Sequence, residues 1–188
     1  MSNPFHKNLE TLLDKMGKQV MNRSKAALQS AKPYSKGGGD LENSVNYKVV
    51  KTDEGYEVQF TMTYYGKFVD KGVSGYQIKR SFTNYQGQNV TAPGNGFRKG
   101  TKVIPIDPLV KWIKRRGLKG RDEKSGRYIS HVSLAFIIGR KIKREGIQGI
   151  SFFQSPLGLA MKTFKDEVKR AVAQDIEDTL KGINFKFD

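Results

Sequence analysis

The chain contains no cysteine, only two histidines and a single tryptophan among its 188 residues. The absence of cysteine excludes disulfide bonds, thiol catalysis and cysteine-based metal sites, and it fits a reducing compartment. His6 and His131 stand far apart in the sequence, and neither shows the spacing of a metal ligand or of a catalytic triad. We therefore expect no catalytic residue, no metal site and no cofactor.

Long apolar runs are also missing. No segment approaches the roughly 20 consecutive apolar residues that are needed to span a bilayer. The first residues include Glu10 and lack an apolar core, so we expect no secretion signal and no membrane partner. At 188 residues the chain is long enough for one domain with a real core, and its apolar residues are clustered and periodic. We predict a single folded domain over residues 1–188.

Acidic residues are scarce relative to basic ones. The chain has 34 Lys and Arg against 18 Asp and Glu, a net charge of +16. Between Lys111 and Arg144 there are 12 basic and 2 acidic residues, a net charge of +10. Such a charge implies an anionic partner, or an assembly that offsets the repulsion. Two interpretations stay open for this stretch: a solvated, well-charged surface or a patch that faces nucleic acid.

The stretch from Phe5 to about Ala31 has the periodicity of an amphipathic helix. Its apolar residues recur at spacings of three and four: Phe5, Leu9, Leu12, Leu13, Met16, Val20, Ala27 and Leu28. Pro33 then ends the helix, and Gly37–Gly39 form a flexible link. These glycines are not a phosphate-binding loop, because no Gly-Lys-Ser or Gly-Lys-Thr follows them.

A β-hairpin is predicted at residues 44–75 as the core of the fold. Tyr56, Val58, Phe60 and Met62 alternate with polar residues, which is typical of a strand with one buried face. A second strand is expected over 44–50, joined to the first by the turn at 52–55. Residues 64–75 should form a tight, aromatic-rich turn.

Asp53 and Glu54 lie at the hairpin turn. We interpret them as turn residues rather than as a catalytic pair, because nothing places a proton donor or a nucleophile beside them.

Residues 76–150 are expected to form an insertion with two basic helices. Residues 76–101 are polar and Gly-rich, and they predict a long loop or an extended hairpin arm that a partner would order. Asp107-Pro108 should begin the first helix, with Asp107 as its cap, and Gly117 should end it. A charged loop follows at 119–127.

The second helix of the insertion is predicted over 130–145. Its buried side is expected to contain Val132, Leu134, Ala135, Ile138 and Ile142. Its end carries four basic residues: Arg140, Lys141, Lys143 and Arg144. These residues complement the negative end of the helix dipole, and this local role competes with any role in DNA binding.

A long closing helix is predicted over 155–181, with Ser155-Pro156 at its start. It has a continuous apolar stripe: Leu157, Ala160, Met161, Phe164, Val168, Ala171, Val172, Ile176 and Leu180. We expect this helix to cover the apolar face of the hairpin, and the alternating tail at 183–187 to add an edge strand or dock on a neighbouring subunit. The predicted class is α+β: a small antiparallel sheet packed against long N-terminal (5–31) and C-terminal (155–181) helices, with two shorter helices inserted.

Several motifs occur in a characteristic order along most of the chain. A Leu-x-x-Ser stretch at 41–44 precedes the hairpin, and an aromatic-Gly-x-aromatic-Val-acid-x-Gly segment at 65–72 follows it. Asp-Pro-Leu-x-x-Trp-Ile-x-x-x-Gly at 107–117 and Ala-Phe-Ile-Ile-Gly-Arg-Lys-Ile at 135–142 come next, before an aromatic segment and the long C-terminal helix. In this order the chain resembles the phage head–tail joining or tail-completion family, which includes small neck proteins of tailed phages. It departs from that family in carrying Asp70 where glutamate is commoner, and in the length of 76–149.

The resemblance implies a non-enzymatic virion protein, located in the neck or tail and made in the host bacterial cytoplasm. Such a protein is a head–tail connector or tail-completion component that forms a ring, a hexamer or dodecamer, around the DNA path. Its partners would be portal, adaptor and tail proteins, with contacts of the heterologous kind between subunits and non-specific contact with genomic DNA.

In that setting the basic residues acquire a specific interpretation. Cations along the DNA path would attract phosphates without reading sequence. We expect five residues to face DNA or a partner: Lys114, Arg115, Arg116, Lys119 and Arg121. The alternative function is a sequence-independent DNA-binding protein that acts outside the virion. An enzyme acting on nucleic acid or a glycan has the least support, since the sequence lacks clustered histidines, cysteine and a phosphate-binding loop.

Overall fold

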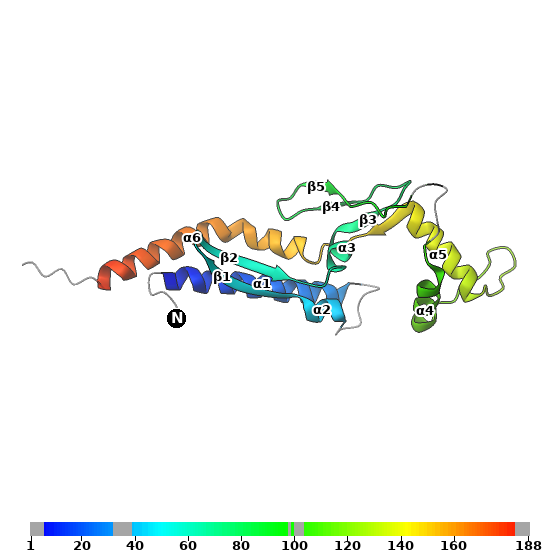
Figure 1. Cartoon of the computed structure of the whole chain (residues 1–188), viewed down its shortest axis with the longest axis horizontal. Helices are drawn as coiled ribbons and strands as arrows, with labels where there is room; N and C mark the ends of the chain where they lie inside the picture. The colour runs from blue at the N-terminus through cyan, green and yellow to red at the C-terminus, as the bar shows by residue number, and fades with distance from the viewer. Residues whose placement is uncertain (1–5, 32–38, 98, 100–103, 183–188) are drawn as a thin grey trace, which may run out of the picture. The chain divides into compact units, whose positions relative to one another are not determined.

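The computed structural model of the chain describes residues 6–31, 39–97, 99 and 104–182 (Figure 1). These residues form six helices and three small antiparallel sheets of two strands each, so the predicted α+β class is confirmed. Contacts group the described residues into two compact units. The first unit contains the residues up to Asp70, 83–88 and those from Ser151 onwards; the second contains 71–82 and 89–150. A single domain over 1–188 stays a prediction.

The first unit is built on helix α1 (Lys7–Ser30) and the hairpin of strands β1 (Asn46–Thr52) and β2 (Gly55–Thr61). The hairpin is confirmed, with β1 beginning two residues later than expected. Thr52 pairs with Gly55 across a two-residue turn, and Gly55 has φ +142°, a backbone conformation that favours glycine.

The Leu-x-x-Ser stretch, which the sequence places at the entry to the first strand, forms the short helix α2 (Asp40–Ser44). The Ser44 hydroxyl donates to the Leu41 carbonyl at 2.8 Å and accepts from the Thr63 backbone N–H at 3.0 Å. Leu41 is buried. The serine therefore closes a helical turn and fixes it to the end of β2, a role that the sequence spacing alone does not reveal.

Helix α1 packs on the apolar face of the hairpin. The hydroxyl of Tyr47 donates to Asp14 at 2.9 Å, and the hydroxyl of Tyr56 donates to Glu10 at 2.8 Å. A Cβ on Gly17 would collide with the Tyr47 ring, so this glycine allows the close approach. The C-terminal helix was expected to cover this face; α1 packs on it, and α6 reaches the hairpin at its turn, where Phe164 and Val168 line a cavity together with Tyr56. Both helices have an apolar stripe, and the pattern does not tell which stripe meets the sheet.

Helix α6 (Gln154–Gly182) begins at a cap supplied from far away in the sequence. One carboxylate oxygen of Asp70 accepts from the backbone N–H groups of Phe153 at 2.8 Å and Gln154 at 3.2 Å. Asp70 belongs to helix α3 (Gly66–Lys71), where a turn was predicted, and it is 2% exposed. Ser155, which was expected at the start of the helix, lies in its first turn.

Helix α1 is capped in the same manner by Asp175 of α6. The two carboxylate oxygens of Asp175 accept from the backbone N–H groups of Asn8 at 2.8 Å and Leu9 at 3.0 Å. Asp175 is 4% exposed. The carboxylate thus satisfies two of the N–H groups that a helix leaves without an intrahelical partner, and it aligns α6 with α1.

In the second unit, strand β3 (Gly72–Ser74) pairs antiparallel with β6 (Gly146–Gln148), a pairing that was not predicted. Strands β4 (Ser81–Thr83) and β5 (Asn89–Thr91) form a hairpin, of which residues 83–88 are assigned to the first unit. Of the two alternatives for 76–101, the hairpin arm is therefore confirmed over the described part. The side chain of Ser74 links β3 to residues 80 and 92, which flank the β4–β5 hairpin. Its hydroxyl donates to the Ala92 carbonyl at 2.8 Å and accepts from the Arg80 N–H at 3.0 Å.

Helices α4 (Ile106–Arg116) and α5 (His131–Glu145) pack against each other in the second unit. Ile113 is fully buried, and Leu109 lies beside Gly139 of α5. Gly117 ends α4 with φ +63°, as predicted. Asp107 is not the cap of α4, because Pro105 occupies that position and the helix begins one residue before the aspartate.

The buried face of α5 is shifted from the predicted one. It is centred on Ala135, Gly139 and Lys143, whereas Val132 is 51% exposed. The small residues Ala135 and Gly139 allow α4 to approach closely, whereas Val132 lies on the same stripe in the first turn of α5 and is exposed there. The predictions for Phe5, Pro33, Gly37 and Gly38 and for the tail at 183–187 lie outside the described residues.

We predict that Asp70→Ala lowers the free energy of unfolding by about 2 kcal/mol, because the N–H groups of Phe153 and Gln154 at the start of α6, the second of them buried, lose their acceptor. Urea unfolding followed by circular dichroism measures the change. Asp70→Asn, which keeps one carbonyl oxygen, should lose less. Asp53→Ala, at the exposed hairpin turn, is the control and should change stability by less than about 0.5 kcal/mol. Equal losses for Asp70→Ala and Asp53→Ala would contradict the capping role.

We predict that Ser74→Ala destabilises the second unit by about 1–3 kcal/mol, since it removes the hydroxyl partner of Arg80 N–H and Ala92 C=O. Trp112 is the single tryptophan and lies in this unit, so its fluorescence reports the unfolding. Ser81→Ala, at an exposed position, is the matched control. An unchanged urea midpoint for Ser74→Ala would show that the hydroxyl does not join the strands.

Candidate functional site

Positive charge is concentrated in the second unit. Counted over the described residues, the first unit has 13 Lys and Arg against 13 Asp and Glu, whereas the second unit has 16 against 4. The first unit is therefore neutral and the second carries a net charge of +12 over these residues. The sequence showed an excess in 111–144, and the division into units shows that residues 71–82 and Lys99 belong to the same basic body.

The five residues predicted to face DNA or a partner, which we call the α4 cluster, all lie in this unit and are all exposed. They are Lys114, Arg115, Arg116, Lys119 and Arg121. The first three occupy the last turn of α4, next to Gly117, where positive charge complements the helix dipole. The other two lie on the loop that leads to α5.

Tyr128 brings the two loop members of the α4 cluster together. The guanidinium carbon of Arg121 lies 4.6 Å from the centre of the Tyr128 ring, and the Lys119 ammonium lies 5.7 Å from it. Arg121 also donates to the Tyr128 hydroxyl at 2.8 Å. The loop is closed by a turn in which Asp122 accepts from the Ser125 N–H at 2.8 Å, and this hydrogen bond lowers the pKa of Asp122. Arg121 and Lys119 are thus held in place at the surface.

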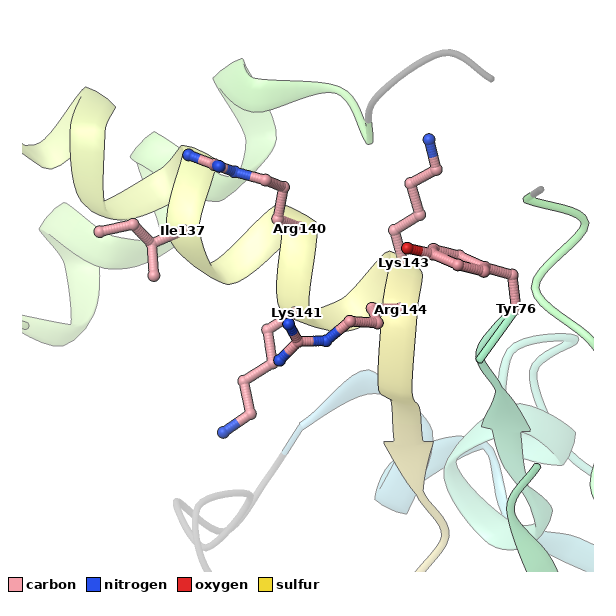
Figure 2. Close-up of a pocket in the computed structure, with 6 residues that line it drawn as sticks. All are labelled: Tyr76, Ile137, Arg140, Lys141, Lys143 and Arg144. Atoms are coloured by element: carbon pink, nitrogen blue, oxygen red, sulfur yellow. The ribbon is translucent and has the colours of Figure 1, made fainter. Parts of the chain in front are cut away.

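A second group of cations surrounds a cavity of about 590 Å³ at the C-terminal end of α5, which we call the α5 pocket (Figure 2). It is lined by Tyr76, Ile137, Arg140, Lys141, Lys143 and Arg144. All except Tyr76 belong to α5, and Figure 2 shows them projecting from successive turns of the helix, with Tyr76 beside its last turn. The sequence revealed these basic residues but not the tyrosine that completes the pocket.

The last carbonyls of α5 accept hydrogen bonds from groups outside the helix. The N–H of Tyr76 donates to the Lys143 carbonyl, and the N–H groups of Gln77 and Ile78 donate to the Arg144 carbonyl. The Asn95 amide adds hydrogen bonds to the Ile142 carbonyl at 3.2 Å and the Lys143 carbonyl at 3.0 Å.

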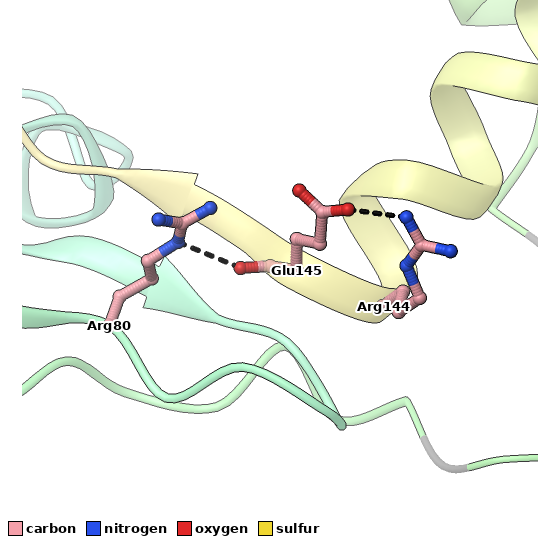
Figure 3. A network of polar contacts seen from close by, with 3 residues as sticks. All are labelled: Arg80, Arg144 and Glu145. Atoms are coloured by element: carbon pink, nitrogen blue, oxygen red, sulfur yellow. Dashed lines mark hydrogen bonds and ion pairs between the residues drawn. The ribbon is translucent and has the colours of Figure 1, made fainter.

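Arg80 completes this cap with a hydrogen bond from Nε to the Glu145 carbonyl at 2.8 Å (Figure 3). These donors all come from residues 76–95. The helix end therefore does not depend on Arg140 or Lys141, which form no hydrogen bond or ion pair with any residue that the structure describes. The local capping role that competed with anion binding is filled by other groups.

Arg144 of the α5 pocket has a directly paired acidic neighbour. Its guanidinium forms a hydrogen-bonded ion pair with the Glu145 carboxylate (Figure 3). The hydrogen bond from Arg144 holds the pKa of Glu145 below its usual value. A depressed pKa means that the contribution of this pair to stability is present above the unfolded-state pKa and is lost as the pH falls through the folded-state pKa.

Three further features of the described residues concern metal ligands, membrane spans and another cavity. Among them, no group of three or more His, Cys, Asp or Glu side chains could hold a metal ion. No helix of the described ranges is long and apolar enough to cross a bilayer. A further cavity of about 810 Å³ lies in the first unit between residues 83–87 and the start of α6, and it has only one charged lining residue, Lys162.

Comparisons with protein-family models, with curated proteins and with solved structures find no match to this chain. The function must therefore be inferred from the residues themselves and from the motif order described above.

We predict that Arg144→Gln raises the pKa of Glu145 towards the value of an unperturbed glutamate, because the carboxylate loses its charged donor. An NMR titration of the glutamate side-chain carboxyl carbons measures this shift directly. Arg127→Gln, at an exposed position outside the α5 pocket, is the control. If the titration midpoint of Glu145 is the same in the wild type and in Arg144→Gln, the ion pair does not form to a measurable extent in solution.

Proposed function

We propose that the chain is a structural virion protein of a tailed phage: a ring-forming neck component, either a head–tail connector or a tail-completion protein, that surrounds the DNA path. The observation that supports this most is the separation of charge between a neutral first unit and a second unit with 16 basic and 4 acidic described residues. The order of motifs along the chain, which resembles that of the phage head–tail joining or tail-completion family, supports it independently.

The charge pattern suits a protein that both assembles with copies of itself and surrounds DNA. Copies of a subunit that approach one another need surfaces whose charges do not repel, and the neutral first unit offers such surfaces. A DNA path needs cations that attract phosphates regardless of sequence, and the α4 cluster offers five exposed ones. In this proposal the subunits form a homo-oligomeric ring through heterologous contacts and meet portal, adaptor and tail proteins above and below.

The alternative function, a sequence-independent DNA-binding protein outside the virion, is favoured by the same positive charge. The two functions differ in what the protein does without DNA. A neck component should oligomerise, or bind a portal-proximal partner, in the absence of DNA. A DNA-binding protein acting alone should remain small and bind duplex DNA with a steep dependence on salt.

Purified virions provide the direct test of the proposed function. We expect the polypeptide in the virion at a fixed copy number, and electron microscopy of intact particles should place it at the neck or tail. Its absence from purified virions, together with a monomeric state in analytical ultracentrifugation, would reject the proposal and favour the alternative.

We predict that replacing the whole α4 cluster with alanine weakens salt-sensitive retention of duplex DNA. If all five residues contact phosphates, the steepness of the slope of log K against log salt should fall by up to about 4.5. Fluorescence anisotropy with a labelled duplex at several salt concentrations measures it.

A matched variant controls for the loss of five positive charges as such. It replaces five exposed lysines of the first unit with alanine: Lys15, Lys18, Lys48, Lys162 and Lys165. We expect this variant to keep most of the salt slope. If the α4-cluster variant assembles and behaves like the wild type at every salt concentration, these residues do not face DNA.

A further inference from the structure

The α5 pocket has a different composition from the α4 cluster, and this difference indicates a different ligand. Four members of its lining, at positions 137, 140, 141 and 144, follow the spacing i, i+3, i+4, i+7 and lie on one stripe of α5. Three of these four are cations and the fourth is Ile137. The stripe ends beside Tyr76, a ring that is 36% exposed.

Tyr76 is held in place by its backbone. Its N–H donates to the Lys143 carbonyl at 3.2 Å, and the preceding Gly75 lies so close to the Arg144 carbonyl that a Cβ there would collide with it. The backbone that carries the ring is therefore fixed at the end of the cationic stripe before any ligand arrives. Such preorganisation lowers the entropy lost on binding.

A row of cations that leads to a partly exposed aromatic ring matches the chemistry of an unpaired nucleotide. Cations attract the phosphates, and an aromatic side chain stacks on the face of a base. Bases inside a duplex are stacked on each other and cannot offer that face. A cavity of about 590 Å³ is also within the range of roughly 300–1,000 Å³ that is typical of small-ligand sites.

We propose that the α5 pocket binds unpaired nucleotides of a single-stranded nucleic acid, with a base stacked on Tyr76 and the phosphates along Arg140, Lys141 and Arg144. A free nucleotide has the same chemistry, but its phosphate would occupy only part of the stripe. A strand uses several cations at once, so it is the ligand that the length of the stripe favours. The inference does not rest on the proposed function, because a protein outside the virion with this pocket would bind the same ligand.

The test compares a labelled dT12 oligonucleotide with a 12-base-pair duplex in fluorescence anisotropy. Tyr76→Ala should weaken binding of dT12 by roughly 5- to 100-fold, the usual effect of losing one stacking ring, and should leave duplex binding unchanged. Tyr76→Phe keeps the ring and should bind dT12 like the wild type. Tyr64→Ala, at an exposed tyrosine of the first unit, is the control and should bind normally.

A second variant tests the cations of the α5 stripe. Arg140→Gln combined with Lys141→Gln should weaken binding of dT12 and lower its salt slope by about 1.4, the value for two phosphate contacts on a single strand. Circular dichroism verifies the fold of each variant. If Tyr76→Ala is unfolded, Tyr76→Leu replaces it, since leucine keeps an apolar side chain but has no ring.

Three results would overturn the inference. The first is an affinity for dT12 that is the same in the wild type and in the variant without the ring. The second is an equal loss of duplex binding in that variant, which would mean that the ring has no special relation to unpaired bases. The third is binding of dTMP as tightly as dT12 and with the same dependence on Tyr76, which would identify a free nucleotide as the ligand. The same behaviour of a 12-residue polyglutamate would identify an acidic peptide as the ligand. If dT12 binds as expected and the protein is absent from virions, only the proposed function fails.

Discussion

Helix ends that are closed by residues from elsewhere in the chain determine how both units are built. In the first unit, the buried carboxylates of Asp70 and Asp175 accept from the first N–H groups of α6 and α1. Each carboxylate lies at the positive end of a helix dipole and satisfies donors that would otherwise have no partner. Apolar packing alone would allow α1 and α6 to slide along each other. The cap of Asp175 on Asn8 and Leu9 fixes their register.

The second unit applies the same rule at the opposite end of a helix, and there it has a consequence for function. Residues 76–78, Arg80 and Asn95 supply the donors to the last carbonyls of α5. Basic side chains near the end of a helix often complement those carbonyls. Here the backbone of residues 76–78, the Asn95 amide and Arg80 do so, and Arg140 and Lys141 remain directed at the surface without a hydrogen-bonding partner among the described residues. The fold thereby keeps positive charge available for an anion.

The sequence predicts well what local periodicity determines, and poorly what depends on distant partners. Period-two alternation located the hairpin, and period 3.6 located α1, α5 and α6 within a few residues. The role of Asp70 was invisible, because its partner Phe153 is 83 positions away. The pairing of β3 with β6 involves only three residues on each strand, too few for any pattern. The basic residues of the α5 pocket were visible, but Tyr76 joins them only through the folded backbone.

The charge of the second unit imposes a last constraint. If each of its four described acidic residues neutralised one basic residue, 12 positive charges would still remain within one small body. Their mutual repulsion opposes folding, and it is strongest at low salt. A polyanion that binds the folded unit removes part of this repulsion and also stabilises the unit by mass action. The excess charge therefore destabilises the free protein and would stabilise a complex with an anion, in line with the proposed contact with DNA.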